Sequence, residues 1–125
     1  MACLIALGLL ILPGCRANRE SWERIQESGV LRVGVDPTFP PFALDVDGVL
    51  SGIDVDLARA LAPEMGLEAQ FTYFGYDGLY DALATEQVDM LISALVIAPE
   101  RTQDFAYSEP YYDAGQVLIV PADSA

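Results

Sequence analysis

The 125-residue sequence contains no histidine, no lysine and only two cysteines. Histidine and cysteine are the side chains that usually bind zinc and copper, so the sequence argues against a site for these metals. Without histidine, nucleophile–base pairs of the Ser-His or Cys-His type cannot be built either. No calcium loop of the D-x-D-x-D-G type is present, although a carboxylate site for a hard cation and acid–base chemistry by Asp or Glu stay open. We therefore expect no catalytic residue, no bound metal and no cofactor.

Basic residues are also scarce, because six arginines face 19 acidic residues and the net charge is −13 at pH 7. Such a surface repels phosphate groups, so we expect no binding to nucleic acid. The hydrophobic content of 53%, with 10 glycines and 8 prolines, is typical of a folded globular protein. A chain of this length is enough for one small domain.

Residues 1–14 differ from the rest because they form an apolar run that is too short to cross a bilayer comfortably. The run is typical of an export signal, although it lacks the usual basic residues before it. It leads into Leu12-Pro13-Gly14-Cys15, which resembles the cleavage box of bacterial lipoproteins and predicts a lipid on Cys15. The alternative is an ordinary signal peptide in which Cys15 has no role. Lipidation of Cys15 would leave the mature domain without a disulfide, and we expect the protein outside the cytoplasm.

Hydrophobic periodicity and turn residues predict alternating strands and helices. Strands are expected at 31–35, 70–74, 88–92 and 116–120, a hairpin at 42–50 turning at Asp47-Gly48, and helices at 21–28, from Asp54 to about Gly66, from Asp77 and from Pro99. Asp54 and Asp77 are expected as N-caps, and Asp54 and Asp56 in solvent. The expected inward face of the second helix comprises Ile53, Leu57, Ala60 and Leu61. The alternation indicates an α/β fold with a parallel-rich sheet flanked by helices on both faces.

Three predicted loops lie where a ligand site is expected. In open parallel sheets, ligands bind beyond the carboxyl ends of the strands, where loops lead into helices. Residues 36–42, 74–77 and 93–101 follow the first three predicted strands in this way. We expect the three loops to converge on one cleft.

Arg101 is the only basic residue in the second half of the chain, where eleven carboxylates lie between residues 64 and 123. If Ala98 is the N-cap of the short helix, Arg101 lies in its first turn, where a cation gains nothing from the helix dipole. A bound anion would remove this conflict, and a carboxylate fits the planar guanidinium best. The alternative is a surface ion pair with a neighbouring acid such as Glu100 or Asp104, worth at most about 1 kcal/mol.

Aromatic and acidic side chains in the same loops have two interpretations each. Phe39, Phe42 and Tyr76 would ordinarily pack in the core or under a lid, but two rings facing each other across a cleft could clamp a ligand side chain or a cation. Asp36 could cap a turn through Thr38 or accept a hydrogen bond from a ligand N–H.

Five segments carry a resemblance to a known family. They are LRVGVDPTFPPF from Leu31, GIDVDLARALAPEM from Gly52, the Tyr76-Asp77 pattern with Leu79 and Leu83, VDMLIS from Val88, and ER…DFAYSEPYY from Glu100. Together they resemble the amino-terminal part of the family 3 extracytoplasmic solute-binding proteins, the amino-acid receptors of bacterial ABC importers. The resemblance implies the first lobe of a two-lobed, periplasmic-binding-protein-like fold of type II.

The resemblance also divides the chain. Residues 1–14 are expected to be a lipoprotein-type signal peptide, and 15–28 the lipidated amino terminus, a connector and a short helix. Residues 29–121 would form the first solute-binding lobe, and 122–125 the start of a crossover to a second lobe. Because members of the family close two lobes on a ligand, we expect the chain to be an incomplete fragment that binds a ligand weakly or not at all.

At the carboxylate end of the ligand, the resemblance makes Arg101 the clamp for an α-carboxylate, helped by Ser93 and the backbone near Ala94 and Val96. Two positions depart from the family pattern. Val96 stands where a Ser or Thr hydroxyl commonly meets the carboxylate, and Ala98 stands where a Thr commonly caps the helix. Loss of a charge-assisted hydrogen bond to the carboxylate would cost roughly 1.5–3 kcal/mol if no other group replaced it.

At the other end, the resemblance places Phe39 and Tyr76 on either side of the ligand side chain and Asp36 near its polar or cationic group. It implies a receptor, anchored by lipid at Cys15, that captures a polar amino acid or a related small carboxylate and presents it to an ABC permease. Two other roles stay open. One is an enzyme on the same scaffold, either a cyclohexadienyl dehydratase or the receptor-like lobe of a lytic transglycosylase, and the other is the sensor domain of a receptor kinase.

Overall fold

The computed structural model describes residues 21–124. The predicted signal peptide at 1–14 and the predicted lipid attachment at Cys15 lie outside these residues. Within the described part, no helix combines the length and the apolar composition needed to cross a membrane.

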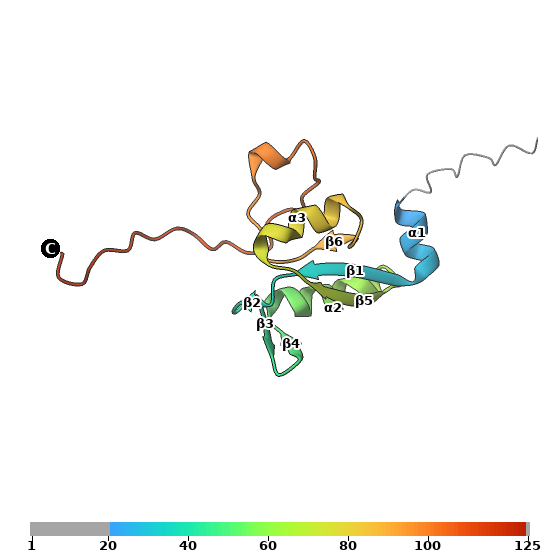
Figure 1. Cartoon of the computed structure of the whole chain (residues 1–125), viewed down its shortest axis with the longest axis horizontal. Coiled ribbons are helices and arrows are strands. Elements are labelled where there is room, and N and C mark those ends of the chain that lie inside the picture. Colours follow the sequence, from blue (N-terminus) through green and yellow to red (C-terminus); the bar gives the residue numbers. More distant parts are fainter. Residues whose placement is uncertain (1–20, 125) are drawn as a thin grey trace, which may run out of the picture.

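A parallel three-stranded sheet forms the centre of the fold (Figure 1). Its middle strand, β1 (Val30–Val35), pairs in parallel with β5 (Glu68–Tyr73) on one side and with β6 (Met90–Leu91) on the other. Helix α2 (Ile53–Glu64) covers one face of the sheet and helix α3 (Tyr76–Ala84) covers the other. The predicted α/β fold, with a parallel sheet between helices, is confirmed.

Shorter elements flank this sheet. They are α1 (Ser21–Ser28), the antiparallel strands β2 (Thr38–Phe39), β3 (Ala43–Val46) and β4 (Val49–Ser51), and the 3₁₀ helix η1 (Pro99–Arg101). The hairpin of β3 and β4 turns at Asp47-Gly48, as predicted. Both turn residues have positive φ angles, 54° and 81°, which two-residue hairpin turns of type I′ require.

The core lies between β1 and α2. One buried cluster joins Leu31 and Val33 of the strand to Ala58 and Ala62 of the helix. A second cluster lies further along the strand and includes Val35. On the other face of the sheet, Leu79 and Ala82 of α3 are also buried. Burial of these apolar side chains is the main favourable contribution to folding.

The start of α2 differs from the prediction. Its N-cap is Gly52, not Asp54, and Asp54 lies inside the helix with only 1% of its surface exposed. The N–H groups of Ile53 and Asp54 donate to the carbonyl oxygens of Pro41 (3.1 Å) and Phe42 (2.9 Å), so a distant loop sets where the helix begins. The fully buried residues of the helix are Asp54, Val55, Ala58 and Ala62. Of the predicted inward face, Leu57 and Leu61 are partly buried and pack against the core, whereas Ile53 and Ala60 are exposed.

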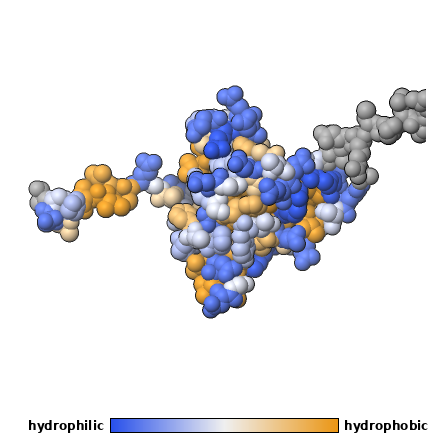
Figure 2. Space-filling model, viewed as in Figure 1, coloured by the Kyte–Doolittle hydropathy of each residue, from blue (hydrophilic) through white to orange (hydrophobic). Residues whose placement is uncertain are grey.

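Two further sequence-based predictions are wrong. The N-cap of α3 is Gly75, so Asp77 lies in the first turn of the helix and does not cap it. Residues 116–120 form no strand, because no strand of the described chain lies beside them. The side chains of Val117, Leu118 and Ile119 are 86–90% exposed, and they form an apolar patch on the extended carboxyl-terminal segment (Figure 2).

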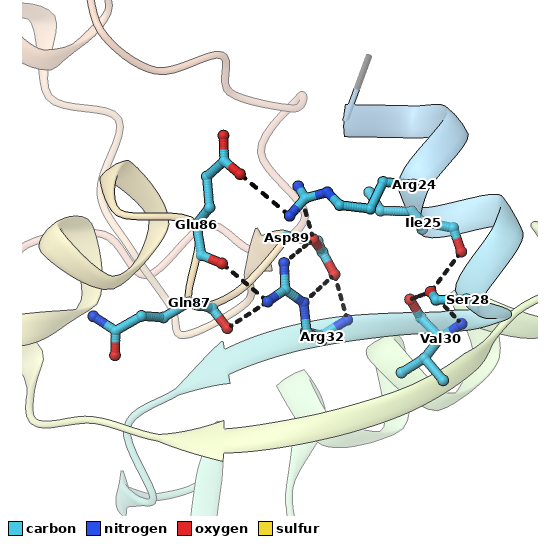
Figure 3. Close-up of polar contacts among 8 residues, drawn as sticks. All are labelled: Arg24, Ile25, Ser28, Val30, Arg32, Glu86, Gln87 and Asp89. Carbon is cyan, nitrogen blue, oxygen red and sulfur yellow. Dashed lines mark hydrogen bonds and ion pairs between the residues drawn. The ribbon is translucent and has the colours of Figure 1, made fainter. Parts of the chain in front are cut away.

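Ion pairs at the amino end of the sheet join α1, β1 and the loop before β6 (Figure 3). Arg32 donates to the carboxylate of Asp89 from its backbone N–H (3.0 Å), from Nε (2.9 Å) and from Nη2 (2.6 Å). Its Nη1 donates to the carbonyl oxygens of Glu86 (2.9 Å) and Gln87 (3.2 Å). Arg24 on α1 pairs with the Glu86 carboxylate at 3.2 Å and lies 3.7 Å from that of Asp89. The network therefore ties the first helix to the sheet.

The Asp89 carboxylate is the centre of this network, and its side chain is only 2% exposed. Burial by itself would raise the pKa of Asp89, but the hydrogen bonds and charge of Arg32, with the charge of Arg24, lower that pKa below its usual value. A carboxyl group whose pKa is lower in the folded state stabilises the fold above its unfolded pKa of about 4. That stabilisation is lost as the pH falls through the folded pKa.

The substitution Asp89→Asn should therefore destabilise the fold in a pH-dependent way. At pH 7 we expect the free energy of unfolding, measured by urea denaturation, to fall by about 2–3 kcal/mol, because Arg32 loses its charged partner. Below about pH 4 the deficit should shrink, because Asp89 takes up a proton at a higher pH in the unfolded chain than in the folded chain, so the wild type loses stability there. Glu86→Gln is the control, and loss of its exposed pair with Arg24 should cost less than about 1 kcal/mol. A deficit for Asp89→Asn that is equal at pH 7 and pH 3 would contradict the assignment.

No residue larger than glycine should fit at position 52. Its φ angle is 128°, and a Cβ atom there would overlap the carbonyl oxygen of Phe42. That oxygen accepts the hydrogen bond from the N–H of Asp54, so it cannot move without loosening the start of α2.

We expect Gly52→Ala to lower the free energy of unfolding by more than about 2 kcal/mol, measured by urea denaturation. Gly66→Ala is the matched control, because Gly66 also has a positive φ (73°) but a Cβ there would meet nothing within 4 Å. The control should cost about 1–2 kcal/mol, from the backbone conformation alone. Equal losses for the two variants would rule out the steric contribution at Gly52.

Candidate functional site

The loops after β1 and β6 meet at the carboxyl edge of the sheet. Ser93 is 6% exposed, and its Oγ accepts a hydrogen bond (2.9 Å) from the backbone N–H of Asp36, the first residue after β1. One carboxylate oxygen of Asp36 accepts hydrogen bonds from the N–H (3.0 Å) and the hydroxyl (2.6 Å) of Thr38. The turn-capping interpretation therefore holds for this oxygen. The other carboxylate oxygen has no hydrogen-bond partner within residues 21–124.

The aromatic rings of the first loop divide between core and surface. Phe42 is 8% exposed and lies edge-on to Tyr112, with ring centroids 5.0 Å apart. Phe39 stacks on Phe42 at 5.6 Å and 15° but keeps 53% of its surface exposed. Phe42 is thus a core residue, and Phe39 presents ring surface to solvent.

Arg101, at the end of η1, lies against an aromatic ring. Its guanidinium carbon is 4.0 Å from the ring centroid of Tyr80. Among the residues that the structure describes, no carboxylate lies within ion-pair distance of Arg101, so the predicted alternative of a surface ion pair is wrong. Ala98 is the N-cap of η1, as predicted, but the helix is only three residues long and its dipole is correspondingly small. Binding of an anion at this position would therefore depend on the guanidinium and not on the helix dipole.

The Tyr80 ring is itself held by contacts with the residues that follow η1. Its hydroxyl is hydrogen-bonded to the hydroxyl of Tyr107 (3.2 Å), and its ring lies 5.3 Å from that of Phe105. Burial and the hydrogen bond to Tyr107 raise the pKa of Tyr80 to about 12, so the phenol is neutral at physiological pH. The ring face therefore offers Arg101 a cation–π contact without competing charge.

The five predicted binding residues fall into two groups. Asp36, Phe39 and Ser93 lie on the loops beside β1, and Tyr76 and Arg101 lie near Tyr80. Tyr76 opens α3 one helical turn before Tyr80 and is 55% exposed. Within the described chain, no hydrogen bond, ion pair or ring contact joins the two groups. The loops after β1 and β6 are joined by the hydrogen bond between Asp36 and Ser93, and the loop after β5 starts beside them, because the N–H of Phe74 donates to the carbonyl oxygen of Val35 at the end of β1 (3.1 Å).

A polar cluster around Tyr111 is missing from the sequence-based predictions. The Tyr111 hydroxyl donates to Oδ1 of Asp54 (2.8 Å) and accepts from the backbone N–H of Ala94 (3.0 Å). The predicted use of this N–H for a ligand is therefore not available while the bond to Tyr111 persists. One signal was present in the sequence: Asp54 lies four and eight residues before Ala58 and Ala62, on the side of the helix that is buried.

Residues 31–125 match the family model for bacterial extracellular solute-binding proteins, family 3. The chain belongs to this family. This solute-binding protein is 35% identical over 95 residues to the ABC transporter arginine-binding protein 1 of Escherichia coli K12, covering 75% of the chain and 39% of that relative. It is 33% identical over 123 residues to the membrane-bound lytic murein transglycosylase F of Aliivibrio fischeri, covering 94% of the chain and 25% of the relative. It spans less than half the length of either relative.

A solved structure gives the same result for the fold. The solute-binding protein is similar to the arginine-bound form of domain 1 from TmArgBP of T. maritima, with a TM-score of 0.70 and 41% identity. The similarity covers 74% of each chain. The predicted resemblance to the first lobe of an amino-acid-binding protein is therefore confirmed.

In this solute-binding protein, Ser93→Ala should loosen the two loops that the serine joins. The substitution removes the acceptor for the N–H of Asp36 and leaves a partly buried donor unpaired, so we expect the free energy of unfolding to fall by about 1–3 kcal/mol in urea denaturation. Ser51→Ala, at an exposed position, should change it by less than about 0.5 kcal/mol. If both variants are equally stable, the hydrogen bond between Asp36 and Ser93 contributes nothing measurable.

Proposed function

We propose that this solute-binding protein captures a polar amino acid or a related small carboxylate outside the cytoplasmic membrane and presents it to the permease of an ABC importer. The main support is the environment of Arg101. Its guanidinium rests on the ring of Tyr80 and has no carboxylate partner in the described part of a chain with net charge −13. A planar guanidinium that is held in position and keeps its charge suits the carboxylate of an amino acid.

The other end of the ligand would meet Asp36 and two exposed rings. Asp36 keeps one carboxylate oxygen for an N–H of the ligand, and Phe39 and Tyr76 offer ring surface for its side chain. This combination of an anion and aromatic faces favours a polar or cationic side chain. The names of relatives that bind arginine agree with that chemistry, so L-arginine is the first probe to test.

The lobe formed by these residues is expected to bind weakly when it is tested alone, because members of the family close two lobes on a ligand. The arginine-bound form of domain 1 from TmArgBP is nevertheless a precedent for one lobe holding its ligand. Titration should therefore extend to millimolar L-arginine and be followed by NMR chemical shifts, which detect weak binding.

The place of the protein in the cell belongs to the same proposal. The family is extracellular by description, and the lipoprotein-like box predicts a lipid anchor at Cys15. An anchored receptor would stay close to its permease, so that each captured ligand has a short distance to diffuse.

An enzymatic role is the second candidate, and the similarity to a lytic transglycosylase over 94% of the chain favours it. We propose binding instead, because the matched part is only 25% of that enzyme. The enzymatic role is tested by incubating the purified protein with a murein suspension, and a fall in turbidity would contradict the binding proposal.

Arg101→Ala is the most direct test of the binding role. We expect it to weaken the affinity for L-arginine at least tenfold, which corresponds to about 1.4 kcal/mol. Arg59→Ala removes the same charge from the surface of α2 and should change the affinity by less than twofold. Arg101→Lys should fall between these two, because lysine keeps the charge but not the bidentate geometry. A loss of less than tenfold for Arg101→Ala would exclude the carboxylate clamp.

A further inference from the structure

Asp54 is a buried acid that the proposed contacts with the ligand do not use. It is the second residue of α2 and is 1% exposed. Its Oδ1 accepts the hydrogen bond from Tyr111, whereas its Oδ2 is buried without any hydrogen bond in the described chain. Burial raises the pKa of Asp54, although the hydrogen bond from Tyr111 and the nearby backbone N–H of Ala94 partly oppose the shift. A buried carboxyl group with one unpaired oxygen costs stability, so its position calls for a role beyond packing.

The hydrogen-bond directions around Tyr111 are fixed by chemistry. The backbone N–H of Ala94 can only donate, so the hydroxyl oxygen of Tyr111 must accept that bond. The single hydroxyl proton then goes to Oδ1 of Asp54. Burial and the neighbouring Asp54 raise the pKa of Tyr111, so this proton stays in place at physiological pH. Asp54 thereby determines which way the hydroxyl of Tyr111 points.

Ala94 needs such a restraint. Its φ angle is 46°, in the left-handed region where a residue with a Cβ pays about 1–2 kcal/mol. The next residue towards the amino terminus is Ser93, which holds the N–H of Asp36. The contacts therefore run from Asp54 through Tyr111 and Ala94 to the two loops that carry Ser93 and Asp36.

We propose that Asp54 is a positioning residue for ligand binding, which acts through the Tyr111 hydroxyl to fix the backbone at Ala94 and so the orientation of Ser93. Asp54 touches no ligand in this scheme. The proposal rests on the proposed amino-acid binding, because its consequence is a change in affinity. It adds to that function a residue that lies outside the proposed ligand contacts.

Two substitutions test it, each with a neighbouring control. Tyr111→Phe deletes the hydroxyl and keeps the ring, with Tyr112→Phe as its control. Asp54→Asn keeps the shape of the side chain and removes its charge, with the exposed Asp56→Asn on the same helical turn as its control. Tyr111 is 43% exposed, so its variant should fold even if Asp54→Asn does not.

The first measurement is amide hydrogen exchange of Ala94 in the absence of ligand. We expect exchange at Ala94 to accelerate at least tenfold in Tyr111→Phe and in Asp54→Asn, and to stay within twofold of wild type in both controls. The second measurement is the affinity for L-arginine, taken well below the melting temperature of each variant so that only folded protein is compared. Both variants should bind at least fivefold more weakly, and both controls should bind like wild type. The double variant should bind no more weakly than Tyr111→Phe alone, because both changes act through one hydroxyl.

The outcomes separate this inference from the proposed function. If the wild-type protein shows no chemical-shift change with arginine or any other amino acid, the proposed function fails and the positioning role fails with it. If wild type binds and Tyr111→Phe binds equally well, only the positioning role fails. Unchanged exchange at Ala94, or additive losses in the double variant, would also overturn it, because Asp54 would then act by another route.

Discussion

Parallel pairing of β1 with both β5 and β6 is the constraint on which the rest of the structure depends. Because the three strands run in one direction, their carboxyl ends lie at the same edge, and the loops that leave this edge start side by side. The contact between Asp36 and Ser93 forms at that edge. At the opposite edge, the pair of Arg32 and Asp89 joins β1 to the loop before β6. The sheet thus separates an end that is held by a buried ion pair from an end that presents the carboxylate of Asp36 and the exposed ring of Phe39.

The four arginines within residues 21–124 are used in two ways. Arg24 and Arg32 lie in ion pairs, where acidic partners offset their charge. Arg59 and Arg101 lie over aromatic rings, at 5.7 Å and 4.0 Å from the ring centroids. A ring face orients a guanidinium but does not neutralise it. In a protein with such an excess of acid, stacking on Tyr80 is therefore a way to place a cation and still leave it able to attract an anion.

The sequence predicted the features that depend on neighbouring residues. The first helix ends at Ser28 before Gly29, as predicted, and the turn at Asp47-Gly48 follows from side chains that tolerate positive φ. The fold class followed from the alternation of strands and helices together with the family resemblance. The resemblance also named Arg101 as a candidate, but nothing near it in the sequence indicates that its partner is the ring of Tyr80.

Features that depend on distant residues were missed. The start of α2 is set by carbonyl groups of the loop before the hairpin, and the interior position of Asp54 depends on the Tyr111 hydroxyl, which comes from a segment far along the chain. Local capping rules favour an aspartate at the helix start and give no sign of such a partner. The prediction of a strand at 116–120 was wrong for a related reason. An apolar run indicates a strand but does not show which strand would pair with it.

That exposed segment has a consequence for how the protein behaves in concentrated solution. Val117, Leu118, Ile119 and Val120 combine high strand propensity with unpaired backbone groups and no charge, which is the composition of segments that pair with other copies. The net charge of −13 opposes such encounters, because any two molecules approach as like-charged bodies. At 0.1 M salt the range of that repulsion is reduced to about 10 Å, whereas the apolar contact between segments is not weakened. Ionic strength therefore controls the colloidal stability of this protein, and low salt favours the dispersed state.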